Sequence, residues 1–558
     1  MKTQIKYIIG VGAIAAITST GCKKDFFNRP PENASTVGTY YQTVDQVNSS
    51  TNILYAAPWF GLNGKAFLAI GDLQGGNAVC YAGTDGSFDA FRNLSEGNAT
   101  QTVASAWNSL FTVVAQANSL LNNLPTAAPP SIPKDIVNNA LGEAHLMRAA
   151  AYFYLVRLFG NVPIITDPAP FVGSFSTVPV NPISDVYKFI TMDLQFAEAN
   201  CRANVATTGH VSSGSASGLL AKVYLYQQKY DSAKIEAEKV IHSGEFGLMG
   251  LDVSGSYTQM FERAGNNCKE SMIALQWTSN SGYGFGNQIQ SVISPNTDIT
   301  GTGDGWAELG PSWDLQDAFK NTGDSIRRHG CIMLGGDFYS ELHKSTGGYT
   351  APLSINAQGV HAGMKKYVVG TPDDNGGYSA FQATSVNTYL LRFADMYLIA
   401  AEAILGKAAN VQPGTGIDTN AVCSDATAIG YLNKIRERAG LPDITGSFTY
   451  KQLLNERRLE FAIEGDYWYD LQRLDGYQPD VKTGNNPIPG HHPVAIAIIS
   501  KQNRGDSNGA GTAANNYTDY QRNILNITPT NDKFLLPIPA TEIAADPNLL
   551  NDPVPYKF

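Results

Sequence analysis

The stretch GSASGLLAKVYLYQQKYDSAKIEAEKVIHS (residues 214–243) decides the fold of this chain. Its apolar spacing predicts two helices joined by a tight turn at residues 229–231. Small Ala221 and Ala233 lie among tyrosine, leucine and other apolar side chains. Small residues where helices cross, with aromatic side chains that fill the gaps, are typical of a tetratricopeptide-type helix–turn–helix unit.

Similar helical patterns precede and follow this pair. They lie at residues 101–124, 132–159, 184–200, 389–406, 426–440 and 449–475. Because the units are degenerate and interrupted, they favour four helix pairs stacked on one another over a uniform solenoid. Regions rich in Gly, Ser and Asn separate them at 62–100 and 278–388, and 476–533 is a third irregular stretch. The region 278–388 is too long for a plain loop and predicts short helices and strands laid over a mainly α scaffold.

The N-terminus has the pattern of an export signal. Two lysines precede a short apolar run at residues 8–17, which is too short to span a bilayer, for which roughly 20 apolar residues are needed. We therefore predict a signal peptide at 1–21. Cys22 follows small residues and resembles the lipidated cysteine of bacterial lipoproteins, although Ser19 stands where leucine is usual. The other interpretation is an ordinary signal peptide with an incidental cysteine. Residues 22–35 then form a polar tether.

Composition narrows the class of function. The 558 residues are 43% hydrophobic and 16% charged, and loss of Lys2 and Lys6 with the signal peptide takes the net charge from −10 to −12. This is a globular composition without a cluster of Lys and Arg, which argues against nucleic acid as a partner. The six cysteines are widely spaced, which indicates free thiols and not a disulfide framework or a zinc site.

No catalytic, cofactor or metal motif stands out, so we expect no cofactor. The string Asp373-Asp374-Asn375-Gly376-Gly377 resembles the start of a calcium loop but lacks the downstream bidentate glutamate, so it predicts a turn. Carboxylate pairs such as Glu456 and Glu460 are expected in any acidic chain of this length. With Arg457 and Arg458 they predict ion pairs along one helix at a spacing of four residues.

Several segments together resemble the SusD-like (RagB/SusD) outer-membrane lipoproteins of Bacteroidetes. They are EAHLMRAAAYFYLVRLFGNVPII (143–165), YLLRFADMYLIAAEAI (389–404) with LNKIRERAGLP (432–442), LLNERRLEFAIEGDYWYDLQRL (453–474), FLLPIPATEIAADPNL (534–549) and the short DAFKNTGDSIRR (317–328). They occur in family order over essentially the whole mature chain.

This resemblance implies a role and not a reaction. Members are surface lipoproteins that bind nutrient glycans and lie over a SusC-like TonB-dependent outer-membrane transporter, which imports the ligand. It implies a single domain at 36–558, with a part at 36–243 and a loop-rich part at 244–558. It also implies right-handed superhelical tetratricopeptide-like helices with irregular insertions that form the ligand face, a location at the outer membrane through lipid on Cys22, and no catalysis.

Aromatic side chains in the insertions are the candidate ligand contacts, because sugars need flat apolar surfaces and a large exposed apolar group usually has a purpose. Trp306, Tyr283 and Phe285 lie among glycines with few apolar neighbours, and Trp313 begins an amphipathic helix nearby. In the first insertion, YAGTDGSFDAFRN, the candidates are Tyr81, Asp85, Phe88, Phe91, Arg92 and Asn93, where the family tends to place ligand contacts. The alternative is a loop that only packs on the scaffold. Trp107 and Trp468 are expected in the core, and Trp59 is left undecided.

Other functions stay open on the sequence alone. A secreted glycoside hydrolase would need two carboxyl groups about 5–9.5 Å apart across a cleft, and no pair stands out in this way. A peptide is an alternative ligand within the same family. A scaffold that binds only protein would bury the loop aromatics and leave no groove.

Overall fold

The computed structural model describes residues 40–81, 86–169, 178–412, 414–476, 482–483, 486–487, 492–506 and 522–558. The predicted signal peptide, Cys22 and the tether lie outside the described residues. Among the described helices, none combines the length and the apolar character that a membrane-spanning segment needs.

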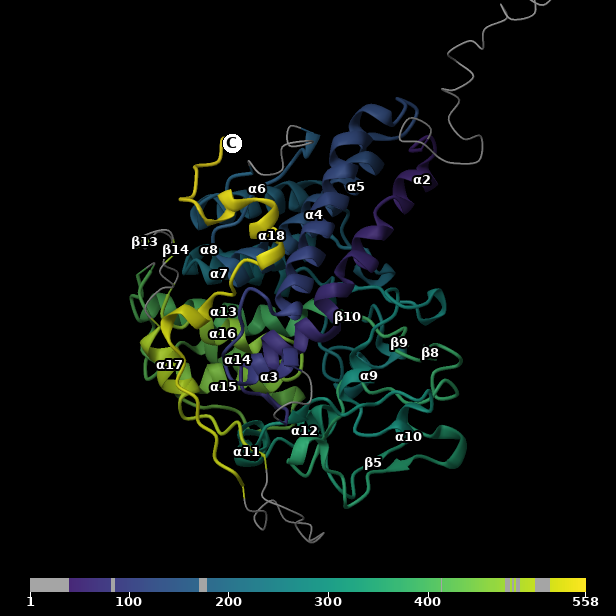
Figure 1. The fold of residues 1–558 in the computed structure, drawn as a ribbon, viewed down its shortest axis with the longest axis vertical. Helices are drawn as coiled ribbons and strands as arrows, with labels where there is room; N and C mark the ends of the chain where they lie inside the picture. The colour runs from purple at the N-terminus through teal and green to yellow at the C-terminus, as the bar shows by residue number, and fades with distance from the viewer. Residues whose placement is uncertain are drawn as a thin grey trace, which may run out of the picture.

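Helices form a continuous stack in which each one packs against the next (Figure 1). In order, they are α4 (Gln101–Ala127), α5 (Lys134–Phe159), α6 (Ile183–Asn200), α7 (Ser213–Tyr226), α8 (Tyr230–Ile241), α13 (Phe393–Ala408) and α14 (Ala426–Arg438). α8 packs on α13 although the whole loop-rich region separates them in sequence. The predicted mainly α, tetratricopeptide-like stack is therefore confirmed.

Small residues allow the close helix crossings that the sequence predicts. Ala221 and Ala233 are fully buried. Gly406 of α13 lies against the ring of Tyr230 at the start of α8, where an added Cβ would come within 2.4 Å of the ring. An aromatic ring thus fills the space that a missing side chain leaves, which is how the stack reaches the close packing of a protein interior.

Shorter elements complete the fold. The other α-helices are α2 (Val44–Ser49), α3 (Gly86–Arg92), α9 (Ile289–Ile293), α10 (Thr297–Thr300), α11 (Trp313–Thr322), α12 (Ser325–Cys331), α15 (Tyr450–Glu460), α16 (Tyr467–Gln472), α17 (Pro493–Ile499) and α18 (Ala540–Ala545). The strands form antiparallel pairs: β1 (Ala78–Val79) with β3 (Gly310–Pro311), β2 (Ser271–Leu275) with β10 (Thr388–Arg392), β4 (Ile332–Met333) with β7 (Gly363–Met364), β5 (Phe338–Tyr339) with β6 (Tyr349–Thr350), β8 (Ser379–Ala380) with β9 (Ala383–Thr384), β11 (Val422–Cys423) with β12 (Phe448–Thr449), and β13 (Lys482–Thr483) with β14 (Asn486–Pro487).

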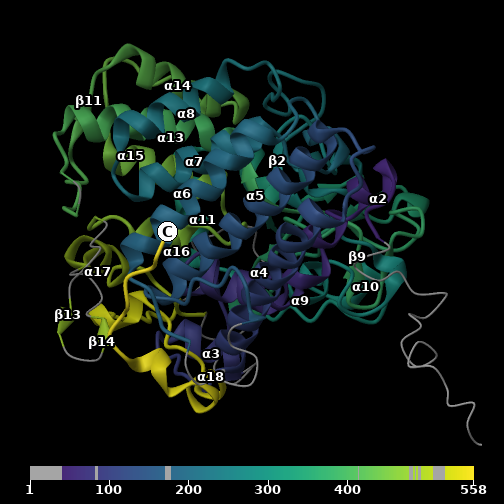
Figure 2. The same ribbon diagram turned by 90° about the horizontal axis from the view of Figure 1, so that it is seen from above.

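The insertions lie beside the helical stack. Figure 1 shows α9, α10 and β9 on the opposite side of the molecule from α13 and α14, and Figure 2 shows α4 and α5 between the two groups. The region 278–388 thus consists of short helices and strands over the scaffold, as predicted. The C-terminal segment returns to the stack, where the Leu536 N–H donates to the Leu158 carbonyl and the Val554 N–H to the Val180 carbonyl.

The helix predicted over 389–406 begins too early. Residues 388–392 form β10, which pairs with β2 so that Thr388 faces Leu275 and Arg392 faces Ser271. The helix α13 begins only at Phe393. A short apolar run fits a buried strand as well as a helix, and here a partner strand more than a hundred residues upstream decides between them.

The helix predicted over 449–475 is two helices, α15 and α16. Ile463 and Gly465 have φ of +61° and +70°, which no α-helix accommodates. Their N–H groups donate to the buried carboxylate of Asp72, at 3.0 and 2.8 Å. An acidic residue from the first insertion therefore caps this turn, and the helical pattern of the sequence does not reveal it.

Buried ion pairs join the scaffold to the loop-rich part. We call Arg327, Arg392, Arg438, Glu270, Glu460 and Glu464 the central network. Arg392, at the end of β10, donates to Glu464 at 2.7 Å, Glu270 at 2.6 Å and Glu460 at 3.0 Å. Although burial alone raises the pKa of Glu460, Arg438 and Arg392 hold it well below its ordinary value. Glu460 therefore stays ionised inside the protein.

The charged residues of α15 pair with other elements and not along their own helix, so the predicted spacing-of-four pairs are wrong. Glu456 binds Arg327 of α12 and Arg436 of α14. Arg457 binds Asp395 of α13 and Asp470 of α16, at 2.7 and 2.9 Å. Because α15 is buried on most sides, its charges meet neighbouring elements and not solvent.

Replacement of Arg392 by methionine tests this network. It removes one cation from three buried carboxylates, which keep Arg438, Arg327 and Lys366 as their ionic partners. We expect a loss of about 3–5 kcal/mol in the free energy of unfolding. The matched control is Lys407→Met, because Lys407 pairs with Asp231 while both side chains are about two thirds exposed. Such an exposed pair is worth under about 1 kcal/mol. Urea unfolding followed by circular dichroism measures both, and equal losses would contradict a central role for Arg392.

Candidate functional site

Exposed aromatic side chains gather on three adjoining loops. Tyr283 and Phe285, in loop 278–286 between β2 and α9, are 69% and 44% exposed. Trp306, in loop 301–309 between α10 and β3, is 36% exposed, and Phe381, at the turn between β8 and β9, is 56% exposed. We call these four residues the aromatic surface. The exposure predicted for Trp306, Tyr283 and Phe285 is confirmed, and their contact with a ligand stays a prediction.

Backbone and side-chain contacts hold these loops together. The Trp306 and Phe381 rings meet edge to face, with centroids 6.2 Å apart. Asp304 is buried, and its carboxylate accepts hydrogen bonds from the Ser291 hydroxyl at 2.6 Å and the Gln382 N–H at 2.7 Å. One carboxylate therefore links loop 301–309 to α9 and to the β8–β9 turn.

The loop that carries Tyr283 and Phe285 docks on the same hairpin. Asn287 and Thr384 form an antiparallel bridge. Gly286 lies so close to Ala383 that an added Cβ would come within 2.4 Å of the alanine Cβ. Tyr283 itself contacts the ring of Phe60, at 5.0 Å between centroids. These contacts attach loop 278–286 to β9.

Tyr81, from the first insertion, borders this group. It is 42% exposed, and its N–H donates to the Gln358 side chain, whose amide in turn donates to the Ala307 carbonyl at 2.6 Å. Gln358 thus connects Tyr81 to the residue that follows Trp306. The structure brings this one candidate of the first insertion to the edge of the aromatic surface.

Three other candidates are buried, so the sequence-based interpretation of them as open platforms is wrong. Phe88 and Phe91 are 0% exposed and pack in the core beneath α3, because the periodicity of this short helix turns both rings inward. Trp313 is 1% exposed and lies under the Arg522 guanidinium, at 4.4 Å.

The other candidates of the first insertion are Arg92, Asn93 and Asp85. Arg92 pairs with Asp89 within α3, and Asn93 donates to the same carboxylate. Their contact with a ligand stays a prediction, and Asp85 lies outside the described residues. Of the other tryptophans, Trp107 and Trp468 are in the core as expected, and Trp59, which the sequence left undecided, is also buried.

Sequence reasoning missed Phe381 and Tyr378. Both belong to GGYSAFQ (376–382), an aromatic segment next to glycines of the kind that singled out Trp306 and Tyr283. Tyr378 is 38% exposed and stacks with the exposed Arg263, whose guanidinium lies 3.5 Å from the ring centroid. The glycine-rich surroundings that singled out Trp306 and Tyr283 would also have identified Phe381 and Tyr378.

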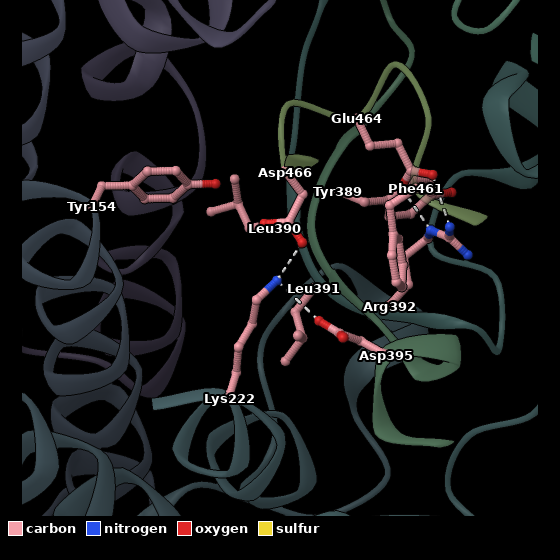
Figure 3. Close-up of a pocket in the computed structure, with 10 residues that line it drawn as sticks. All are labelled: Tyr154, Lys222, Tyr389, Leu390, Leu391, Arg392, Asp395, Phe461, Glu464 and Asp466. Atoms are coloured by element: carbon pink, nitrogen blue, oxygen red, sulfur yellow. Dashed lines mark hydrogen bonds and ion pairs between the residues drawn. The ribbon is translucent and has the colours of Figure 1, made fainter. Parts of the chain in front are cut away.

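A small hollow lies between α7, β10, α13 and the turn after α15 (Figure 3). Its walls include Lys222, which binds Asp395 and Asp466, each at 2.9 Å, and Arg392, which binds Glu464. The water-accessible volume is about 20 Å³, room for about one water molecule. Because it is this small and its lining charges are paired, the hollow is part of the core and not a ligand site.

Comparison with known proteins now identifies the family. Residues 325–554 match the family described as the SusD family, and residues 79–225 match the family described as "Starch-binding associating with outer membrane". A SusD-like protein of Bacteroides ovatus is 30% identical over 572 aligned positions that cover all of both chains. This chain belongs to the SusD-like family.

Solved structures of other proteins share the fold of this SusD-like protein. One was determined with a xylogluco-oligosaccharide and is 27% identical to this chain. The match covers 92% of this chain and 99% of that protein, with a TM-score of 0.77. A laminarin-binding SusD-like protein is 23% identical, covers 92% of this chain and 100% of its own, and has a TM-score of 0.65. The second likeness shows the fold alone.

Acrylamide quenching of tryptophan fluorescence tests the geometry of the aromatic surface without any ligand. Of the six tryptophans only Trp306 is more than 5% exposed. We expect the quencher-accessible fraction of the emission to vanish in Trp306→Phe and to persist in the control Trp313→Phe, because quenching needs contact with the indole. Unchanged accessibility in Trp306→Phe would contradict the described exposure.

Proposed function

We propose that this SusD-like protein binds a nutrient glycan at the cell surface, without cleaving it, and delivers it to a SusC-like TonB-dependent outer-membrane transporter. The observation that carries the proposal is the aromatic surface, with four large rings exposed on loops that touch one another. Large exposed apolar groups gathered in one place mark a site of interaction. The C–H faces of sugar rings are the chemical complement of such rings.

The comparisons support a carbohydrate as the ligand. The neighbour that is 27% identical over nearly its whole length was solved with a xylogluco-oligosaccharide. The family matched by residues 79–225 is described as starch-binding. A xyloglucan fragment is therefore the first ligand to test.

The proposed location follows from the N-terminal segment and the family. The description "associating with outer membrane" supports an outer-membrane location. Acylation of Cys22 would supply the anchor, and the tether at 22–35 would hold the folded part away from the lipid. The transporter as partner comes from the family resemblance.

The carboxylates of the three loops support binding without hydrolysis. Asp304 is 1% exposed and is used for hydrogen bonds between loops. Glu308 pairs with Lys65 at 2.9 Å. A glycosidase needs one carboxyl group that is free to donate a proton and a second that faces it across the sugar, and these two carboxylates have structural partners instead.

Affinity electrophoresis tests the proposal. The soluble protein from Asp25 onward, which contains every described residue, is run through gels that each hold one polysaccharide, with xyloglucan first. We expect retardation in at least one gel without shortening of the polymer. Trp306→Ala and Phe381→Ala should each weaken binding about tenfold, since a central aromatic contact is worth more than about 1 kcal/mol.

The control variant is Phe558→Ala. Phe558 is 49% exposed and lies near the C-terminus, where it contacts Tyr556 and Lys188. Its removal should leave retardation unchanged. Release of reducing ends from the retarded polymer would contradict a non-catalytic role, and equal weakening by Phe558→Ala would contradict the location of the site.

A further inference from the structure

The three loops of the aromatic surface contain no basic residue. Their sequences are TSNSGYGFG (278–286), GTGDGWAEL (301–309) and GGYSAFQATSV (376–386), without lysine, arginine or histidine. The exposed side chains between the rings are uncharged and polar, as at Thr278, Asn280 and Ser281. Such groups exchange hydrogen bonds with sugar hydroxyls but offer no counter-charge to an anion.

The cations that touch this region are few and mostly neutralised. Lys65 is paired with Glu308. Arg522, which covers Trp313, is paired with Asp317 at 2.5 and 3.0 Å. The exposed Arg263 stacks on Tyr378 at the margin. Lys344 is also exposed, and its ammonium donates to the Asp374 carbonyl shortly before the segment 376–386. Among the described residues, a polymer with one carboxylate or sulfate on each sugar would therefore meet few exposed cations along several sugar units.

Exposed carboxylates flank the same loops. Asp298 lies in α10, directly before loop 301–309, and Asp373 lies shortly before the segment 376–386, and both residues are exposed. The whole chain carries a net charge of −10. Like charges across an interface disfavour a partner, and an anion that loses water without gaining a cation is costly to bind.

From this arrangement we propose that the aromatic surface takes a neutral glycan, built from uncharged hexoses or pentoses, and rejects uronate-rich and sulfated polysaccharides. The inference rests on the proposed glycan-binding function and names the chemical class of its ligand. The rings supply stacking area, the neutral side chains supply hydrogen bonds, and the flanking carboxylates act against polyanions. Selection against the wrong class by repulsion is a common route to specificity.

The experiment uses the same soluble protein and two sets of polymers. The neutral set is xyloglucan, mixed-linkage β-glucan, galactomannan, arabinan and starch. The anionic set is polygalacturonate, alginate and chondroitin sulfate. We expect retardation only in the neutral set, with an affinity that changes less than twofold between 20 and 500 mM NaCl, because no charge pair is made.

Variants of charged residues test whether charge contributes to polymer binding. Arg263→Gln should leave the affinity for the neutral polymer within about threefold, whereas Trp306→Ala should lower it about tenfold. Asp298→Asn with Asp373→Asn should also leave neutral binding unchanged. Retardation by an anionic polymer that weakens steeply with salt, or that is lost in Arg263→Gln, overturns the neutral class while glycan binding stands. No retardation by any polymer of either set overturns both proposals.

Discussion

Ionic groups buried in the interior constrain the rest of this structure. Arg392 is 1% exposed and binds Glu270, which precedes β2, together with Glu460 and Glu464, at the end of α15 and in the turn after it. A buried charge is tolerated only when it is paired and hydrogen-bonded. The ends of β10 and α15 must therefore meet at fixed positions. Specific geometry of this kind selects one arrangement among the many that apolar packing alone would allow.

The buried charges and the exposed aromatic rings lie in different parts of the chain. The segments that resemble the family, such as 143–165 and 453–474, supply the buried charges and the stack. Arg157, for example, lies between the rings of Phe153 and Tyr469, at 4.0 and 4.1 Å, and so ties α5 to α16. The exposed rings lie on loops outside these segments. Loops positioned by a rigid scaffold are a common location for binding residues.

The sequence predicted much of the fold and part of the site. Helices α4 to α8 have an apolar face that repeats with the helical period, and such a face is readable without the structure. The strand β10 and the break after α15 were missed, because β2 and Asp72 decide them from far away in the chain. Among aromatics, glycine-rich surroundings correctly marked Trp306 as exposed. Phe88 was a candidate because of its place in the first insertion, and it is buried because α3 turns its ring inward.

By itself, then, the sequence determined the mainly α class, the positions of the long helices, the family, and the absence of basic residues from the three loops. These depend on local periodicity and composition. Only the tertiary structure decided which aromatic rings are exposed together, since Trp306 and Phe381 are 75 residues apart and meet through contacts around Asp304. It also decided the partners of the buried charges. Both depend on distances between segments far apart in the chain, and local sequence patterns do not determine those distances.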